Sequence, residues 1–72
     1  MPENITMLEL RNSWFPAKFR WNNRVYEIEA VNECQTVAPA HNPSYHFLVR
    51  CEGRFLRLTH LMRSNQWLLN QD

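Results

Sequence analysis

The sequence is poor in the residues that mark several common kinds of functional site. Its single glycine, Gly53, cannot build the glycine-rich loop that cradles a phosphate group. It has one lysine beside seven arginines, and its net charge of +1 creates no strong overall field of either sign. No stretch approaches the roughly 20 apolar residues that span a bilayer, and Glu3 and Glu9 interrupt the apolar run that a secretory signal requires. We therefore expect a cytoplasmic protein that does not contact a membrane.

Cysteine is also scarce, since the chain has only Cys34 and Cys51. Neither cysteine belongs to a CxxC motif, and no pair of histidines has HxxxH spacing, so the local pattern of a metal site is missing. The strand order derived below puts the two cysteines at opposite ends of the sheet, beyond the roughly 7 Å that a disulfide allows between Cα atoms. We predict two free thiols, with Cys51 in the core and Cys34 at the edge of a loop, and neither a metal nor a cofactor.

The chain is rich in large apolar side chains. Hydrophobic residues make up 44% of the 72 residues, and 12% of the residues are aromatic. A chain of this length forms one domain near the lower limit for folding on a core alone. We predict a single small β domain over residues 1–72, in which residues 1–4 and 70–72 are frayed.

Residues 16–28 form the clearest local pattern, a β-hairpin whose turn is Asn22-Asn23. Asparagine tolerates the left-handed conformation that a type I′ turn needs at both central positions. In this register Phe19 faces Tyr26 and Trp21 faces Arg24. One face of the hairpin is then apolar, and the other carries charged side chains.

The remaining strands follow from alternation of apolar and polar residues. Residues 5–10 fit a strand, although a short helical turn is the alternative. The second strand of the hairpin is expected to run from 24 to about 33 with a bulge or bend near Ala30, followed by a loop over 34–43. Strands are then predicted at 44–52, 54–61 and 66–69.

A type II′ turn at Gly53-Arg54 is expected to connect two of these strands, since that turn prefers glycine first. It places Arg50 directly opposite Arg57 on the outer face and Val49 opposite Leu58. A loop over 62–65 then sets Leu58 opposite Leu69 and His60 opposite Trp67. The predicted core residues are the following: Trp21, Tyr26, Phe47, Leu58 and Trp67.

The ionisable residues do not converge into a catalytic pattern. The acidic residues mostly alternate along strands as solvated side chains do, and His60 lies between Phe47 and Trp67, where we interpret it as a histidine at the edge of the core. We therefore predict that the protein is not an enzyme and has no small-molecule substrate.

Arginines and aromatic residues on a small sheet favour a nucleic-acid interface, because bases stack on aromatic rings beside basic groups. Glutamates interleave with these arginines, so a solvated face of balanced charge is the other reading. Trp14 and Phe15 lie outside regular structure, where they either plug an open end of the sheet or form a binding surface. The candidate binding residues are the following: Arg20, Arg24, Arg50, Arg54, Arg57, Trp14 and Phe15.

The chain resembles a family of small uncharacterised bacterial domains that open with PxxFxWxGRxYxV and close with WxL. The resemblance rests on Pro16, Phe19-x-Trp21, Arg24-x-Tyr26-x-Ile28 and Trp67-x-Leu69. Asn23 stands where that family has glycine, and Cys34-Gln35 stands where it often has tryptophan. The resemblance implies an all-β fold, and some family members are associated with error-prone DNA polymerases and DNA repair. It implies no functional residues.

The sequence as a whole predicts an all-β domain of five or six short antiparallel strands in a meander, curled into a small SH3-like barrel or half-barrel. The expected function is a non-enzymatic binding module for nucleic acid or a DNA-handling protein. The alternative is a protein–protein adaptor or an oligomerising structural domain.

Overall fold

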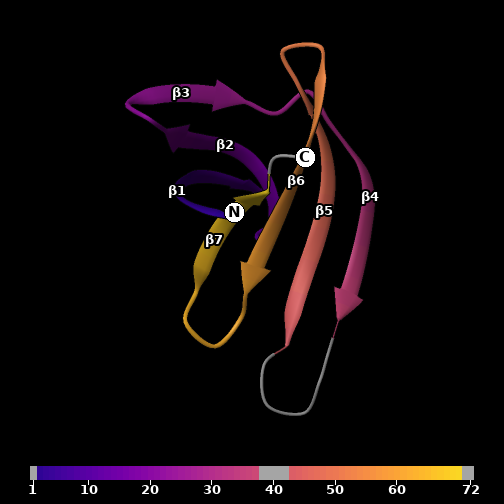
Figure 1. Cartoon of the computed structure of the whole chain (residues 1–72). Helices are drawn as coiled ribbons and strands as arrows, with labels where there is room; N and C mark the ends of the chain where they lie inside the picture. Colours follow the sequence, from indigo (N-terminus) through magenta and orange to yellow (C-terminus); the bar gives the residue numbers. More distant parts are fainter. Residues whose placement is uncertain (1, 38–42, 71–72) are drawn as a thin grey trace.

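The fold is all-β, in a computed structural model that describes residues 2–37 and 43–70. These residues form seven antiparallel strands and no helix (Figure 1). The strands are β1 (Glu3–Arg11), β2 (Phe15–Trp21), β3 (Arg24–Glu27), β4 (Ala30–Val37), β5 (Ser44–Cys51), β6 (Arg54–Leu61) and β7 (Gln66–Asn70). The expectation of five or six strands is wrong in number, because residues 24–33 divide into two strands. The described residues contain no helix that could span a lipid bilayer.

The strands form one sheet in the order β3-β2-β1-β7-β6-β5-β4, which curls into a half-barrel (Figure 1). β3 and β4 are consecutive in the chain and yet lie at opposite edges of this sheet. Two residues join them: the N–H of Ile28 donates to the carbonyl of Ala17 in β2 at 2.9 Å, and the N–H of Glu29 donates to the carbonyl of Arg50 in β5 at 2.8 Å. These two bonds hold the two edges together at one end. A register shift in β4 between Val31 and Glu33 follows directly, in agreement with the bulge or bend expected near Ala30.

The β2–β3 hairpin has the predicted register. Phe19 pairs with Tyr26 and Trp21 pairs with Arg24. Asn22 and Asn23 have φ values of 51° and 64°, the positive values of a type I′ turn. Asparagine adopts this conformation more readily than most residues with a side chain, which is why the turn forms without glycine.

The β5–β6 hairpin turns one residue earlier than predicted. Glu52 and Gly53 are the turn residues, with φ values of 52° and 75°, so the turn is of type I′ rather than type II′. Arg50 therefore pairs with Phe55, and Arg57 pairs with Leu48. The predicted opposition of Arg50 and Arg57 is wrong, because the pairing is displaced by two residues.

A displacement of two residues keeps every side chain on its predicted face, since successive side chains alternate between faces. The predicted pairs of β6 with β7, His60 with Trp67 and Leu58 with Leu69, are confirmed. The cross-strand rows differ from the predicted ones only in the residue that β5 contributes. They are Phe47–Leu58–Leu69 and Tyr45–His60–Trp67.

The segment after Ala30 was expected to become a loop at Cys34, but β4 continues to Val37. Cys34 lies within β4 and pairs with Phe47 of β5, while Val37 pairs with Ser44. The polar composition of this segment is overridden by the hydrogen bonds that β5 offers along its whole length. Residues 38–42, the rest of the predicted loop, lie outside the described residues.

The chain ends are more ordered than expected. Glu3 and Asn4 pair with Leu69 and Leu68 of β7, and Asn70 pairs with Arg57 of β6. The structure places Glu3, Asn4 and Asn70 in paired strands, whereas frayed segments were expected over 1–4 and 70–72. Residues 1, 71 and 72 lie outside the described residues.

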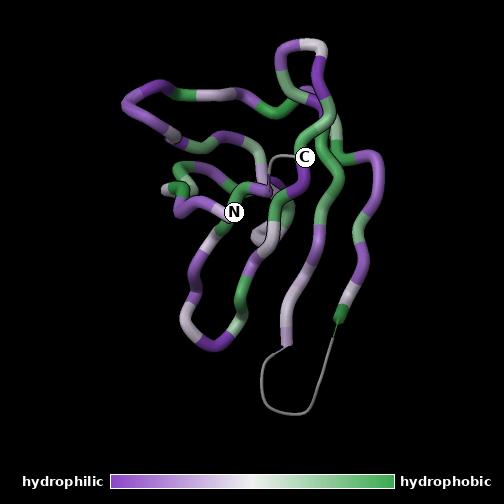
Figure 2. The backbone as a smooth tube through the Cα atoms, viewed as in Figure 1, coloured by the Kyte–Doolittle hydropathy of each residue, from purple (hydrophilic) through white to green (hydrophobic). Residues whose placement is uncertain are grey.

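The core fills the inside of the half-barrel. Hydrophobic and hydrophilic residues alternate along much of the sheet (Figure 2), and the fully buried side chains are almost all apolar. Four of the five predicted core residues are buried, and Trp21 is half-buried. The buried hydrophobic residues are Ile5, Phe19, Tyr26, Ile28, Phe47, Val49, Cys51, Leu56, Leu58, Trp67 and Leu69.

Candidate functional site

The five candidate arginines do not form one surface. Arg50 and Arg57 lie on the outer face of β5 and β6, since the buried side chains of those strands alternate with them. Arg24 and Arg54 lie beside the two hairpin turns, paired with Trp21 and Cys51. Arg20 lies on the outer face of β2, and β1 and β7 separate its strand from β6.

Arg24 has a structural partner. Two hydrogen bonds, 2.8 and 2.9 Å long, connect its guanidinium to both carboxylate oxygens of Glu52. The guanidinium carbon also lies 4.9 Å from the centre of the Tyr26 ring. Arg24 therefore links the β2–β3 hairpin to the β5–β6 turn, and its charge is neutralised by a bidentate pair.

An exposed aromatic ring lies between the outer arginines of β5 and β6. Phe55 has 59% of its surface exposed, more than any other large exposed hydrophobic residue among those described. It pairs directly with Arg50, and Arg57 projects from the same face two residues further along β6. We call Arg50, Phe55 and Arg57 the β5–β6 outer patch. Phe55 is out of phase with the inward-facing Leu56 and Leu58 of the same strand.

The charge of Arg50 is only loosely compensated. Arg50 Nε lies 3.8 Å from a carboxylate oxygen of Glu29, and both side chains have 56% of their surface exposed. An exposed contact of this length contributes little, on the order of 0–1 kcal/mol. A phosphate group could therefore displace Glu29 from Arg50 at small cost.

A shallow hollow of about 90 Å³ adjoins the patch on the outer face, next to Arg57. His46 forms part of its lining and lies within a chain of hydrogen bonds. The Asn70 amide donates to Thr59 Oγ1 at 3.3 Å. Thr59 Oγ1 lies 3.3 Å from Nδ1 of His46, and the other ring nitrogen of His46, Nε2, lies 3.1 Å from Ser44 Oγ. Ser44 Oγ in turn donates to the carbonyl of Val37 at 3.4 Å.

The direction of this chain assigns the proton of His46. Since a hydroxyl carries one proton, Ser44 donates to Val37 and must accept from His46 Nε2–H. Thr59 Oγ1 accepts from the Asn70 amide and lies against Nδ1 on the other side of the ring. The Ser44 hydroxyl is therefore directed to the carbonyl of Val37 and connects the start of β5 to the end of β4.

Trp14 and Phe15 close one end of the half-barrel. Their ring centres are 4.1 Å apart, and Trp14 lies 5.2 Å from Tyr45 and 6.0 Å from Phe47. Phe15 is the first residue of β2, so the expectation that it lies outside regular structure is wrong. Trp14 thus packs on aromatic residues of β5 while it keeps 38% of its surface exposed.

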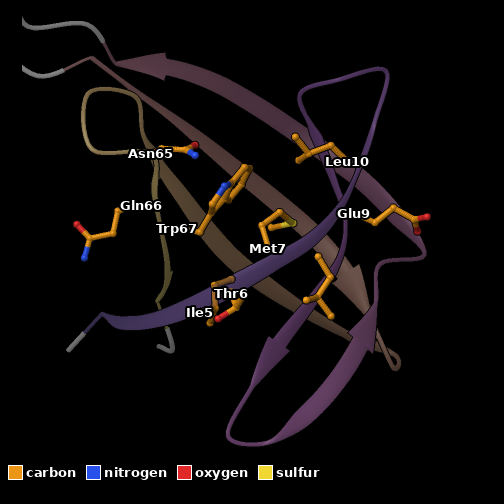
Figure 3. A pocket seen from close by; sticks show the side chains of 9 residues that line it. Ile5, Thr6, Met7, Glu9, Leu10, Asn65, Gln66 and Trp67 are labelled. Carbon is orange, nitrogen blue, oxygen red and sulfur yellow. The ribbon is translucent and has the colours of Figure 1, made fainter.

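A larger groove lies between β1 and the start of β7 (Figure 3). Its volume is about 540 Å³, and residues 5–10 and 65–67 line it. Met7 and Trp67 point into it from opposite sides (Figure 3). We call this hollow the β1–β7 groove, and no feature of the sequence pattern predicts it.

The cysteines are free thiols, Cys51 buried and Cys34 exposed. Burial raises the pKa of both, and for Cys51 the neighbouring carboxylate of Glu52 raises it further. The Cys51 thiol also donates to the carbonyl of Glu27 at 3.3 Å, which favours its neutral form. Within the described part of the chain, no group of three or more His, Cys, Asp or Glu residues could hold a metal ion.

Comparison with known proteins places the chain in no group, because no family model, no curated protein and no solved structure matches it.

Proposed function

We propose that the protein is a non-enzymatic module that binds single-stranded nucleic acid through the β5–β6 outer patch. The observation that supports this proposal is the 59% exposure of Phe55 between two arginines on one sheet face. An exposed aromatic ring on a sheet is a platform on which an unpaired base can stack. Arg50 and Arg57 project from the same face, where a phosphate backbone on either side of that base would lie.

The geometry favours a single strand over a duplex. A base can stack on Phe55 only when its face is free, and the bases of a duplex stack on one another. The balanced net charge of +1 also argues against tight binding to a duplex, because that binding depends on many phosphate contacts. A cytoplasmic location, consistent with two free thiols, and an SH3-like form of the half-barrel belong to the same proposal.

The test is a fluorescence-anisotropy titration of labelled oligo(dT) and oligo(U) at two salt concentrations. Phe55→Ala should weaken binding, because a stacked base is worth about 1–3 kcal/mol, or roughly 5- to 150-fold in dissociation constant. Arg50→Gln with Arg57→Gln should flatten the salt dependence by about 0.7 log units per lost phosphate contact.

The control is Arg20→Gln, which removes one of the two units of charge that the double variant removes, from an exposed strand position away from the patch. It should leave affinity nearly unchanged. If the parent binds neither oligonucleotide at low salt, the proposal fails. If Arg20→Gln weakens binding as much as the double variant, general charge rather than the patch carries the affinity.

The alternative function, an adaptor that binds other proteins, is favoured by a separate surface. That surface is the β1–β7 groove, which presents strand backbone and apolar side chains rather than arginines.

A further inference from the structure

β1 is longer than β7, the strand that pairs with it on one side. Its first residues, Glu3 to Ile5, pair with Leu69 to Trp67 of β7. β7 begins at Gln66, where the chain has just turned from β6, so no strand among the described residues pairs with residues 6–10 on this side. The other side of β1 pairs with β2 as far as Arg11. The β1–β7 groove is thus the space beside an open strand edge.

The open edge is bent away from β7. The β1–β2 register shifts between Met7 and Glu9 and again between Glu9 and Leu10, and such bulges bend a strand and increase its twist. Beyond Ile5, this bend widens the gap between β1 and β7, and the widened gap is the groove. Five residues of extended chain span roughly 16 Å, enough for a short strand to lie along the edge.

The walls of the groove are held in place by hydrogen bonds. The Gln66 amide donates to Asn4 Oδ1 at 2.7 Å and closes the narrow end between β7 and β1. Asn65 Oδ1 lies 2.8 Å from His60 Nε2, whose ring stacks on Trp67 at 4.1 Å. A groove with fixed walls requires little reorganisation when a ligand enters.

The lining shows what kind of chain fits. Leu8 and Leu10 have 41% and 40% of their surface exposed, and these leucines stand on an edge where proteins commonly place lysine or proline to prevent pairing. Glu9 is the only charged residue of the lining. Its carboxylate lies 4.0 Å from Lys18, which is nearer to Glu27 at 3.8 Å. A lining with a carboxylate and no arginine disfavours a phosphate backbone and suits a peptide with a basic residue opposite Glu9.

We propose that the β1–β7 groove binds an extended, mainly apolar segment of another protein, which pairs with residues 6–10 of β1 and places a basic side chain against Glu9. Main-chain hydrogen bonds to an open edge supply affinity in this mode, and alternate side chains supply specificity. The proposal is independent of nucleic-acid binding, because the groove uses β1, which β7 and β6 separate from β5 in the sheet.

The probe is a phage-displayed library of linear eight-residue peptides, selected on the intact protein and then synthesised with a fluorescent label. The selected peptides should alternate apolar and other residues and carry a lysine or arginine. Methylating one hydrogen-bonded backbone nitrogen of the peptide should weaken binding about 2- to 12-fold. Glu9→Gln should weaken it about 1.4- to 5-fold.

Leu8→Lys tests the edge itself, and Val25→Lys is its matched control, because Val25 is similarly exposed at 46% on β3. Leu8→Lys should weaken peptide binding while Val25→Lys leaves it unchanged, with both variants folded by circular dichroism. The proposal is overturned if no peptide is selected, or if a selected peptide binds equally well to Leu8→Lys or after methylation at every backbone nitrogen. It is also overturned if the protein is a dimer that Leu8→Lys dissociates, since a second copy of this chain then fills the groove.

Discussion

Truncating Phe47 should remove most of the stability of the domain. Its ring is 1% exposed and packs 5.7 Å from Trp67 and 6.2 Å from Phe15, measured between ring centres. Phe47→Ala deletes a buried ring from the middle of this cluster, which costs about 3–5 kcal/mol. At about 0.05–0.15 kcal/mol per residue, a domain of 72 residues has about 4–11 kcal/mol in total. The melting temperature should therefore fall by about 12–40 °C, at about 4–8 °C per kcal/mol.

The same substitution at Phe55 is the control, because Phe55 is 59% exposed. Phe55→Ala should change the free energy of unfolding by less than about 0.5 kcal/mol, as exposed positions usually do. Urea denaturation followed by tryptophan fluorescence measures both variants, provided that circular dichroism gives the same midpoint. Equal midpoints for the two variants would refute the assignment of the inner and outer faces of β5 and β6.

Four further predictions concern the two thiols, the Arg24–Glu52 ion pair and the turn at Gly53. A thiol reagent should label Cys34 much faster than Cys51 in the folded protein, because only Cys34 is exposed; equal rates would contradict the burial of Cys51. Since folding raises the pKa of Cys51 above its usual 9.0, the folded state holds this proton more tightly, and the free energy of unfolding should fall as the pH rises above about 9. A double-mutant cycle with Arg24→Gln and Glu52→Gln should give a coupling of about 0.2–1 kcal/mol in urea denaturation, and zero coupling would show that the bidentate pair is not stable in solution. Gly53→Ala should cost about 1–2 kcal/mol in the same assay, because φ is +75°; since a Cβ there would meet no atom within 4 Å, a much larger cost would mean a steric clash that the structure does not show.

Where the turn chemistry was distinctive, the sequence predicted the structure closely. The Asn22-Asn23 turn and the loop over 62–65 led to registers that the structure confirms. Gly53 was less informative, because glycine suits the first position of one turn type and the second position of another. The error moved the pairing by two residues, which preserved the faces and therefore the core, but it changed the cross-strand partners of Arg50 and Arg57.

The path from β3 to β4 could not be predicted from the sequence. It depends on hydrogen bonds from Ile28 and Glu29 to strands that are distant along the chain and belong to opposite halves of the sheet. The extension of β4 through Cys34 depends in the same way on its pairing with β5. Local propensity carries no information about either pairing.

The candidate site was predicted only in part. Arg50 and Arg57 were named, but Phe55 was missed, although its alternation with the inward-facing Leu56 and Leu58 marks it as outward. Arg24 was also named as a candidate, but its guanidinium forms an ion pair with Glu52. The sequence could not place Arg20, because the position of β2 relative to β6 follows from the sheet order alone.

Photocrosslinking tests the central claim most directly. An oligo(dT) that carries 5-iodouracil at one position is bound to the protein, irradiated and digested, and the crosslinked residue is located by mass spectrometry. A base stacked on the exposed ring should crosslink at Phe55, and the yield should fall in Phe55→Ala but not in Arg20→Gln. Crosslinking at Trp14 in place of Phe55, or no crosslink at saturating protein, would contradict binding through the β5–β6 outer patch.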